Sequence, residues 1–314
     1  MVYTVTLNPA LDYIVRTDAL RLGEMNRASG TAIQFGGKGI NVSAMLRTLG
    51  VDNVALGFTA GFTGKELERR LRACNIHTDF VWLKKGQTRI NVKVKAEEES
   101  GRIEETEINA GGPEISAQAL ESLFQKLDGF VSGDMLVLAG SIPGTLPSDI
   151  YRQILQRVDG RGVLTVVDAE GNLLLDALAY RPFLVKPNRS ELSALFDKTL
   201  ETDEEILACA RELQSRGARN VLVSLAGDGS MLLDETGELR RLPGLRGYVR
   251  NSVGAGDSMV AGFLAGWLES GDYEVAHMLG TAAATATVFA NGLATRREIR
   301  EIIWNSRLYF RALL

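Results

Sequence analysis

The amino-acid sequence predicts an α/β fold built on a mostly parallel β-sheet, and three features support this. Short runs rich in β-branched residues alternate with segments whose apolar residues recur at helical spacing. Most of the runs are apolar throughout, which is typical of strands covered by helices on both faces of a sheet. The chain has 314 residues, of which 45% are hydrophobic, and that is enough for one large domain or two moderate ones.

The expected elements follow one another with few interruptions. Strands are expected at 2–8, 53–58, 135–141, 163–170, 183–188 and 220–227, and helices at 39–50, 64–74, 147–158 and 203–217. Gly50 suits the end of the first helix, and Pro147 suits the start of the third. The segment 274–290 is rich in Ala and Thr and contains His277, so we expect a helix buried in the protein rather than a membrane span.

One segment, residues 88–109, breaks this alternation. Two runs with a hydrophobic period of two residues lie on either side of residues 99–101, which predicts a β-hairpin. Its first run places Ile90, Val92 and Val94 on one face and Arg89, Asn91, Lys93 and Lys95 on the other. Together with part of 12–35, the hairpin is expected to form a small flap over the main sheet. Because an apolar face needs cover, we expect a second subunit to supply it.

Composition and charge exclude several classes of partner. The net charge is −4, so no general basic field favours nucleic acid or an acidic membrane surface. Cys74 and Cys209 are the only cysteines, and neither has a partner at a metal-ligand spacing. This fits a reducing compartment and argues against a disulfide scaffold or a zinc site. The start of the chain, MVYTVTLNPALDYIVR, does not read as a signal peptide. We therefore expect a cytoplasmic protein.

The stretch NSVGAGDSMVAGF, residues 251–263, offers two interpretations. Gly254, Ala255 and Gly256 precede Asp257 at the expected start of a helix. The first N–H groups of a helix lack internal partners and carry positive partial charge, and glycine lets them approach a phosphate closely. A carboxylate beside them can accept a proton from a hydroxyl that attacks the phosphate. A plain helix start with an acidic first turn explains the same residues equally well.

A second glycine cluster, FGGKGIN at 35–41, also leads into a helix. Its spacing matches neither a P-loop nor the G-x-G-x-x-G dinucleotide motif. Gly37 and its glycine neighbours permit the close approach of a sugar, Asn41 can bind hydroxyl groups, and Lys38 can bind an anion. A tight turn with an exposed lysine is the simpler explanation of this cluster taken alone.

Two charged residues near the expected flap are candidates for substrate contacts. Asp12 follows the first strand, where a carboxylate can accept hydrogen bonds from two sugar hydroxyls. Arg89 lies at the foot of the flap and offers a bidentate match to a phosphate. A turn residue and an exposed strand arginine are the simpler alternatives.

The exits of two later strands are also polar. In VKPNRSEL, Asn188 and Glu191 lie three residues apart at an expected helix start, where they can organise water around Mg²⁺ or form a capping box. In SLAGDGS, polar and glycine residues can border a nucleotide or form a hairpin turn. The residues concerned there are Ser224, Gly227 and Gly229.

Taken in order, these motifs resemble those of the ribokinase-like carbohydrate kinases, specifically the phosphofructokinase B group. The series TLNPALD, GGKGIN, TRINVK, GSIP, VKPNRSEL, SLAGDGS and VGAGDSMVAG spans about residues 1–295. The resemblance implies one ribokinase-like domain over 1–314, a three-layer sandwich with a β-sheet lid formed by about 12–35 and 88–109. It also implies transfer of the γ-phosphate of ATP to a sugar hydroxyl, with Mg²⁺, in a homodimer held through the lid.

The same resemblance implies roles for individual residues. Asp257 is expected to be the catalytic base, beside an anion hole formed by Gly254, Ala255 and Gly256. The sugar phosphate is expected to contact Asp12, Arg27, Gly37, Lys38, Asn41 and Arg89. The nucleotide is expected at Lys186, Asn188, Ser224, Gly227 and Gly229, with Mg²⁺ held near Glu191 through water. Asn251 replaces the aspartate of some relatives, which puts their monovalent-cation site in question.

The motif TRINVK is most similar to that of family members that phosphorylate fructose 1-phosphate at its 6-hydroxyl, giving fructose 1,6-bisphosphate. Tagatose 6-phosphate is the second candidate acceptor, and fructose 6-phosphate the third. Two functions of other classes fit less well. An NAD(P)-dependent oxidoreductase needs a glycine fingerprint after its first strand, which TLNPALD does not supply. A non-catalytic sugar-phosphate or nucleotide sensor would be expected to lose the base, yet Asp257 is present.

Overall fold

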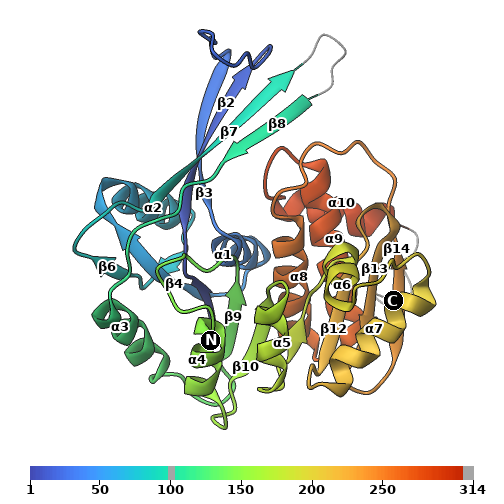
Figure 1. Cartoon of the computed structure of the whole chain (residues 1–314). Coiled ribbons are helices and arrows are strands. Elements are labelled where there is room, and N and C mark those ends of the chain that lie inside the picture. Colours follow the sequence, from blue (N-terminus) through green and yellow to red (C-terminus); the bar gives the residue numbers. More distant parts are fainter. Residues whose placement is uncertain (98–102, 307–314) are drawn as a thin grey trace.

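The computed structural model describes residues 1–97 and 103–306, which form one large sheet and one small sheet (Figure 1). The large sheet has the order β14-β13-β12-β11-β10-β9-β1-β4-β5, and β6 also pairs with β4. Its parallel strands are β1 (Val2–Thr6), β4 (Asn53–Ala60), β5 (His77–Thr78), β6 (Val81–Leu83), β9 (Met135–Ala139), β10 (Leu164–Asp168), β11 (Leu184–Val185) and β12 (Asn220–Ser224). Two antiparallel strands, β13 (Gly229–Leu233) and β14 (Leu239–Pro243), complete one edge. The expected mostly parallel sheet is confirmed.

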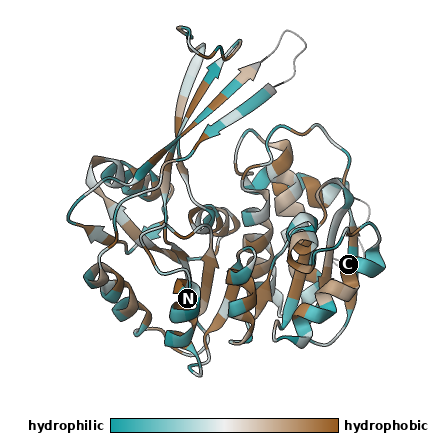
Figure 2. Cartoon of the chain, in the orientation of Figure 1, coloured by the Kyte–Doolittle hydropathy of each residue, from teal (hydrophilic) through white to brown (hydrophobic). Residues whose placement is uncertain are grey.

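Helices cover both faces of the large sheet, because its strands carry apolar side chains in both directions. In β9, Leu136 and Leu138 enter one core while Met135 and Val137 enter the other. One layer contains α3 (Ala117–Leu127), α4 (Ile150–Val158), α5 (Asn172–Leu178), α6 (Arg189–Phe196) and α7 (Asp203–Ser215). The other contains α1 (Lys38–Leu49), α8 (Ala255–Ser270), α9 (Tyr273–Phe289) and α10 (Arg296–Asn305), and α2 (Gly61–Ala73) packs beside α1. Figure 2 shows the largely hydrophobic strands between these layers.

Several predicted elements differ in extent from those observed, and two of them show a physical reason. The strand expected at 183–188 is reduced to β11, and the segment that follows it contains Pro187, which cannot donate to a neighbouring strand. The helix expected at 147–158 begins instead at Ile150, whose N–H donates to the carbonyl of Pro147 in the preceding turn. The helix expected near 274–290 is α9, most of whose residues are buried. Among the described residues, no helix has the length and apolar character that crossing a bilayer requires.

The small sheet, which we call the flap, has the strand order β3-β2-β7-β8 and rises from the top of the body in Figure 1. Its strands are β2 (Ala10–Thr17), β3 (Gly30–Gly36), β7 (Arg89–Glu97) and β8 (Ile103–Ile108). The central strands β2 and β7 are parallel, whereas the two outer pairs are antiparallel. These strands fall close to the ranges expected from the sequence. The predicted turn at 99–101 lies outside the described residues.

The helices α8 and α9 approach so closely that their backbones are in contact. A Cβ atom on Gly262 of α8 would lie 2.5 Å from the carbonyl oxygen of Leu279, so only glycine fits there. A buried hydrogen bond of 2.9 Å between the hydroxyls of Ser258 and Thr287 joins the same pair. The first turn of α8, which carries Asp257, is thereby fixed to the body of the protein.

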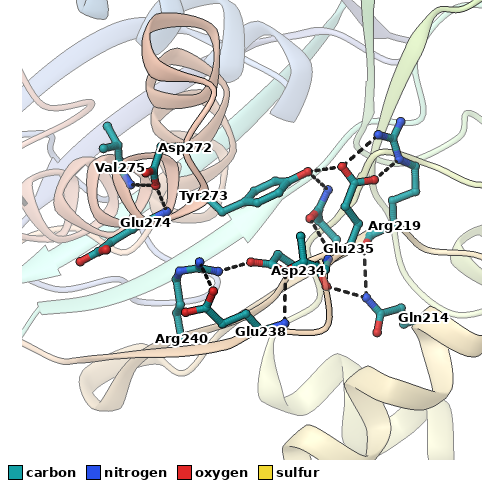
Figure 3. Close-up of polar contacts among 12 residues, drawn as sticks. Gln214, Arg219, Asp234, Glu235, Glu238, Arg240, Asp272, Tyr273, Glu274 and Val275 are labelled. Atoms are coloured by element: carbon teal, nitrogen blue, oxygen red, sulfur yellow. Dashed lines mark hydrogen bonds and ion pairs between the residues drawn. The ribbon is translucent and has the colours of Figure 1, made fainter.

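A polar cluster fastens the antiparallel edge of the sheet to α9 (Figure 3). Glu235, in the turn between β13 and β14, accepts hydrogen bonds from the Arg219 guanidinium and from the Tyr273 hydroxyl. The neighbouring Asp234 is buried and pairs with Arg240. Because this turn contacts the start of α9 directly, the edge strands and the helix pair are held as one unit.

Candidate active site

A cavity of about 1110 Å³ lies between the flap and the carboxyl ends of the parallel strands. This is the edge of an open α/β sheet at which ligands bind. Most of the residues singled out in the sequence meet there. They are Asp12, Gly37, Lys38, Asn41, Arg89, Lys186, Asn188, Glu191, Ser224, Gly254, Gly256 and Asp257. The structure therefore brings together motifs from the first strand to the eighth helix.

Four of the predicted site residues do not line this cavity. Ala255 begins α8 but does not line the cavity. Gly227 lies in the turn after β12, and Gly229 is the first residue of β13. A Cβ on Gly229 would be 2.1 Å from the carbonyl oxygen of Leu242, so close backbone packing accounts for that glycine. Arg27 is exposed in the segment between β2 and β3, and its carbonyl accepts a hydrogen bond from Thr17.

Asp257 lies in the first turn of α8 with 5% of its surface exposed. Gly254 is the N-cap residue of this helix, and its φ of 81° is in the left-handed region that glycine adopts without strain. The side-chain amide of Asn41 donates a hydrogen bond of 2.8 Å to Oδ2 of Asp257. Asn41 was expected to contact the sugar, and its bond to this carboxylate was not foreseen.

Burial, followed by the charge of Asp168, raises the pKa of Asp257 to about 7. The Asn41 hydrogen bond and the ammonium groups of Lys186 and Lys38 oppose that rise. A carboxylate with a pKa near neutrality is matched to accepting a proton at physiological pH.

The N-terminus of α8 has the groups that favour an anion. The N–H groups of Gly256 and Asp257 belong to the first turn, which has no preceding turn to accept from them. A Cβ on Gly256 would lie 3.1 Å from the Lys186 amine, so that cation stands directly beside the turn. Helix N–H groups and an ammonium converge here on one part of the cavity, which favours negative charge.

Asp168, at the end of β10, is a functional candidate that sequence reasoning missed. It is 1% exposed, and both of its carboxylate oxygens lack a hydrogen-bond partner. Oδ1 lies 3.4 Å from the Lys186 amine and 3.7 Å from the Lys38 amine. The available signal was its position, since a carboxylate ending an apolar strand reaches the ligand-binding edge of the sheet.

Asn188 and Glu191 form the capping box that was one of their two interpretations. The Asn188 side chain accepts from the Glu191 N–H, and Oε2 of Glu191 accepts from the Asn188 N–H, each at 2.8 Å. Both residues also line the cavity, and burial raises the pKa of Glu191. Capping therefore occupies one oxygen of Glu191 and does not exclude a second role for the other.

The flap supplies the far wall of the cavity. Asp12 accepts hydrogen bonds from Asn91 and Lys93 of β7, at 2.9 Å and 3.2 Å. Arg89 donates to the carbonyls of Asn8 and Ala110. Asn91 and Lys93 belong to the polar face predicted for the hairpin, although neither was assigned a role.

Comparison with known proteins shows which family the chain belongs to. The model of the pfkB family carbohydrate kinases matches residues 5–300. The 1-phosphofructokinase of Bacillus subtilis is 41% identical over 304 residues, covering 96% of this chain and 97% of the relative. The D-tagatose-1-phosphate kinase of Bacillus licheniformis is 38% identical and covers 93% and 94%. A crystal structure of Escherichia coli phosphofructokinase-2 in complex with substrates and products is 29% identical, covers 98% and 99%, and has a TM-score of 0.91. As its motifs predicted, this chain belongs to the pfkB family of carbohydrate kinases.

Proposed function

We propose that this kinase transfers the γ-phosphate of ATP to the 6-hydroxyl of fructose 1-phosphate, giving fructose 1,6-bisphosphate and ADP. The observation that carries the proposal is the pairing of Asp257 with the N-terminus of α8. A buried carboxylate and a cluster of N–H donors face the same cavity, beside a lysine amine. Proton removal and stabilisation of a moving phosphoryl group need these two kinds of group side by side.

In this proposal Asp257 accepts the proton of the acceptor hydroxyl as its oxygen bonds to the γ-phosphorus. The bond from that phosphorus to the β,γ-bridging oxygen breaks, and the electron pair leaves with ADP. The N–H groups of the first turn of α8 stabilise the charge on the transferred group. Lys186 stands beside that turn and provides a second source of positive charge.

The residues at the nucleotide end fit a hydrated Mg²⁺. Asp168 presents two buried oxygens without hydrogen-bond partners, and Glu191 has an oxygen outside its capping box. Among the described residues, no group of three or more His, Cys, Asp or Glu side chains could hold a metal ion by itself. This suits a cation that keeps much of its water and is held by nucleotide phosphates. Mg²⁺ supplies charge neutralisation on the phosphates.

The charges of the cavity favour an acceptor that already carries a phosphate. Four cations line it, and three of these form ion pairs: Lys38 and Lys186 with Asp168, and Lys93 with Asp12. Arg89 makes no ion pair with any described carboxylate. Its guanidinium is anchored by backbone carbonyls and retains donor capacity for an anion.

The choice of acceptor rests on the relatives. Both curated relatives described above are named for ketohexoses phosphorylated at C1. The more similar one is a 1-phosphofructokinase, and we therefore favour fructose 1-phosphate. Tagatose 1-phosphate replaces tagatose 6-phosphate as the second candidate, because the tagatose kinase among the relatives is named for the 1-phosphate.

Initial rates of ADP release test the acceptor directly. The purified protein is assayed with ATP, Mg²⁺ and, in turn, fructose 1-phosphate, tagatose 1-phosphate, tagatose 6-phosphate and fructose 6-phosphate at equal concentrations. We expect the highest kcat/KM with fructose 1-phosphate. A higher value with any other acceptor would overturn the substrate assignment, and no ADP release with any of them would overturn the kinase proposal.

We also propose that two copies of the chain associate through the outer face of the flap. That face carries Ile33, Ile90 and Ile108, each more than a third exposed. An apolar groove of about 430 Å³ continues from it to the exposed Phe62 of α2. Escherichia coli phosphofructokinase-2 has a tetrameric inhibited form, which supports association within the family. Arg27 does not line the cavity of its own chain. In such a dimer, its predicted contact could be with a sugar phosphate bound in the cavity of the other copy.

A further inference from the structure

The inner face of the flap contains a chain of alternating charges that reaches the acceptor end of the cavity. Lys93 projects from β7 with 9% of its side chain exposed. Its amine lies 3.2 Å from Oδ2 of Asp12 and 3.1 Å from Oε1 of Glu107. Because Asp12 is on β2 and Glu107 on β8, Lys93 joins three strands of the flap through one ammonium group.

The carboxylate of Asp12 is held on every side that the flap supplies. Asn91, two residues before Lys93 on the same strand, donates a hydrogen bond of 2.9 Å to the other oxygen of Asp12, Oδ1. The backbone of β3 closes a third side, since a Cβ on Gly36 would lie 2.6 Å from Oδ1. Two donors from one strand and this close backbone therefore fix the orientation of the Asp12 carboxylate.

The ammonium of Lys93 persists despite its burial. Burial alone would lower the pKa of Lys93, but Asp12 and Glu107 outweigh it and the pKa is raised. The pKa of Glu107 is lowered, because burial would raise it but the hydrogen bonds from Asn109 and Lys93 and the charge of Lys93 outweigh burial. Loss of the ammonium would leave the carboxylates of Asp12 and Glu107 facing each other without a cation between them.

We propose that Lys93 is a positioning residue for the acceptor sugar, and that it acts by fixing the carboxylate of Asp12. This rests on the proposed function, in which Asp12 binds hydroxyl groups of the acceptor. Glu107 contributes to this positioning, because its ion pair with the Lys93 amine holds that amine from the side opposite Asp12. The orientation of the Asp12 carboxylate determines which hydroxyl groups can donate hydrogen bonds to it. Lys93 therefore contributes to discrimination between acceptors that differ in the configuration of one hydroxyl.

The test compares Lys93→Met with a control on the same face of the same strand. Lys95 also pairs across β7 and β8, with Glu105 at 3.2 Å, but it makes no ion pair with Asp12. For Lys93→Met we expect the KM for fructose 1-phosphate to rise about tenfold or more, as when one partner of a buried charge pair is lost. The KM for ATP and the slow hydrolysis of ATP without acceptor should stay near the wild-type values. Lys95→Met should resemble wild type in all three.

Two further variants separate positioning from loss of fold. Lys93→Arg keeps a cation with two or more donors between the carboxylates, and it should recover most of the affinity for fructose 1-phosphate measured by calorimetry. In an Asp12→Asn background, Lys93→Met should add little further loss, since both changes act at one contact. The ratio of kcat/KM for fructose 1-phosphate over tagatose 1-phosphate should move towards unity in Lys93→Met.

The outcomes distinguish this inference from the proposed function. Wild type that releases no ADP with any ketohexose phosphate overturns the function. An active wild type in which Lys93→Met equals wild type, or in which Lys95→Met is equally impaired, overturns the role of Lys93. So do additive losses in the Asp12→Asn background, which would show that Lys93 acts independently of Asp12.

Discussion

At the scale of single residues, the site shows which contacts a sequence can reveal. Asp257 could be proposed from the sequence because its neighbours form a local motif, in which small residues at an expected helix start place free N–H groups beside the carboxylate. Asp168 has no such motif, and its effect on Asp257 depends on β10 and α8, which come together only in the folded protein. The bond between Asn41 and Asp257 joins residues 216 positions apart, which no local pattern predicts. Sequence thus identified the carboxylate, while the fold determined its pKa.

Replacing Asp257 by Asn removes the proposed base and keeps the shape of the side chain. We expect kcat to fall about 100- to 10,000-fold, the range of general-base catalysis. The dissociation constant for ATP, measured by calorimetry, should change little because the N–H groups of α8 remain. Turnover near the wild-type rate would rule out the assignment of Asp257 as the base.

The pH dependence of catalysis should follow the pKa of Asp257. Since the base must be ionised, kcat/KM should fall as the pH drops through about 7. Asp168 raises that pKa, so Asp168→Asn should move the fall to lower pH, whatever its effect on the maximal rate. A pH–rate profile of both proteins decides this, and an unchanged midpoint would contradict the coupling.

At the scale of elements, periodicity and end signals predicted most strands and helices of the large sheet. They failed where tertiary contacts set the boundary, as at Pro147, which lies in a turn before α4. The residues on each face of β7 were also predicted, but which face is buried was not. The polar face of Lys93 and Asn91 is the buried one, because β2 pairs with β7 over the cavity. A single strand cannot reveal which side its partners and ligands occupy.

The start of α8 offers a prediction about an element end. Gly254→Ala forces a left-handed φ of 81° on alanine and brings a Cβ to 2.7 Å from Leu293. We expect a loss of about 1–2 kcal/mol in unfolding free energy, together with a reduced kcat because the N–H donors shift.

Gly271→Ala at the other end of α8 is the matched control. Gly271 also has a left-handed φ, of 67°, but nothing lies within 4 Å of its Cβ position. Urea titration should show a similar loss of unfolding free energy in both variants, whereas kcat should fall only in Gly254→Ala. Equal kcat values in the two would show that the anion site tolerates displacement of the helix start.

At the scale of the whole molecule, the flap has a polar inner face over the cavity and an apolar outer face towards solvent. If two copies associate through that outer face as proposed, Ile108→Asp or Ile33→Asp should shift the protein from dimer towards monomer in sedimentation velocity, because a charge would be buried in the interface. Val131 is 63% exposed in the loop before β9, away from the flap, and Val131→Asp should leave assembly unchanged. A wild-type protein that is monomeric at micromolar concentration would contradict the dimer.

The parallel pairing of β2 with β7 has a consequence for how the protein acquires its activity during synthesis. Asp12 and Asn91 are 79 positions apart, and α1, β4 and α2 are built between them. The flap therefore cannot fold as a separate insertion, but all of its strands emerge from the ribosome before residue 110. Asp257, the proposed base, emerges far later, with α8. Because a domain folds as a unit, we expect the proposed sugar-binding wall and the proposed base to come together only once α8 and α9 have packed, so that turnover begins after the last helices of the site are made.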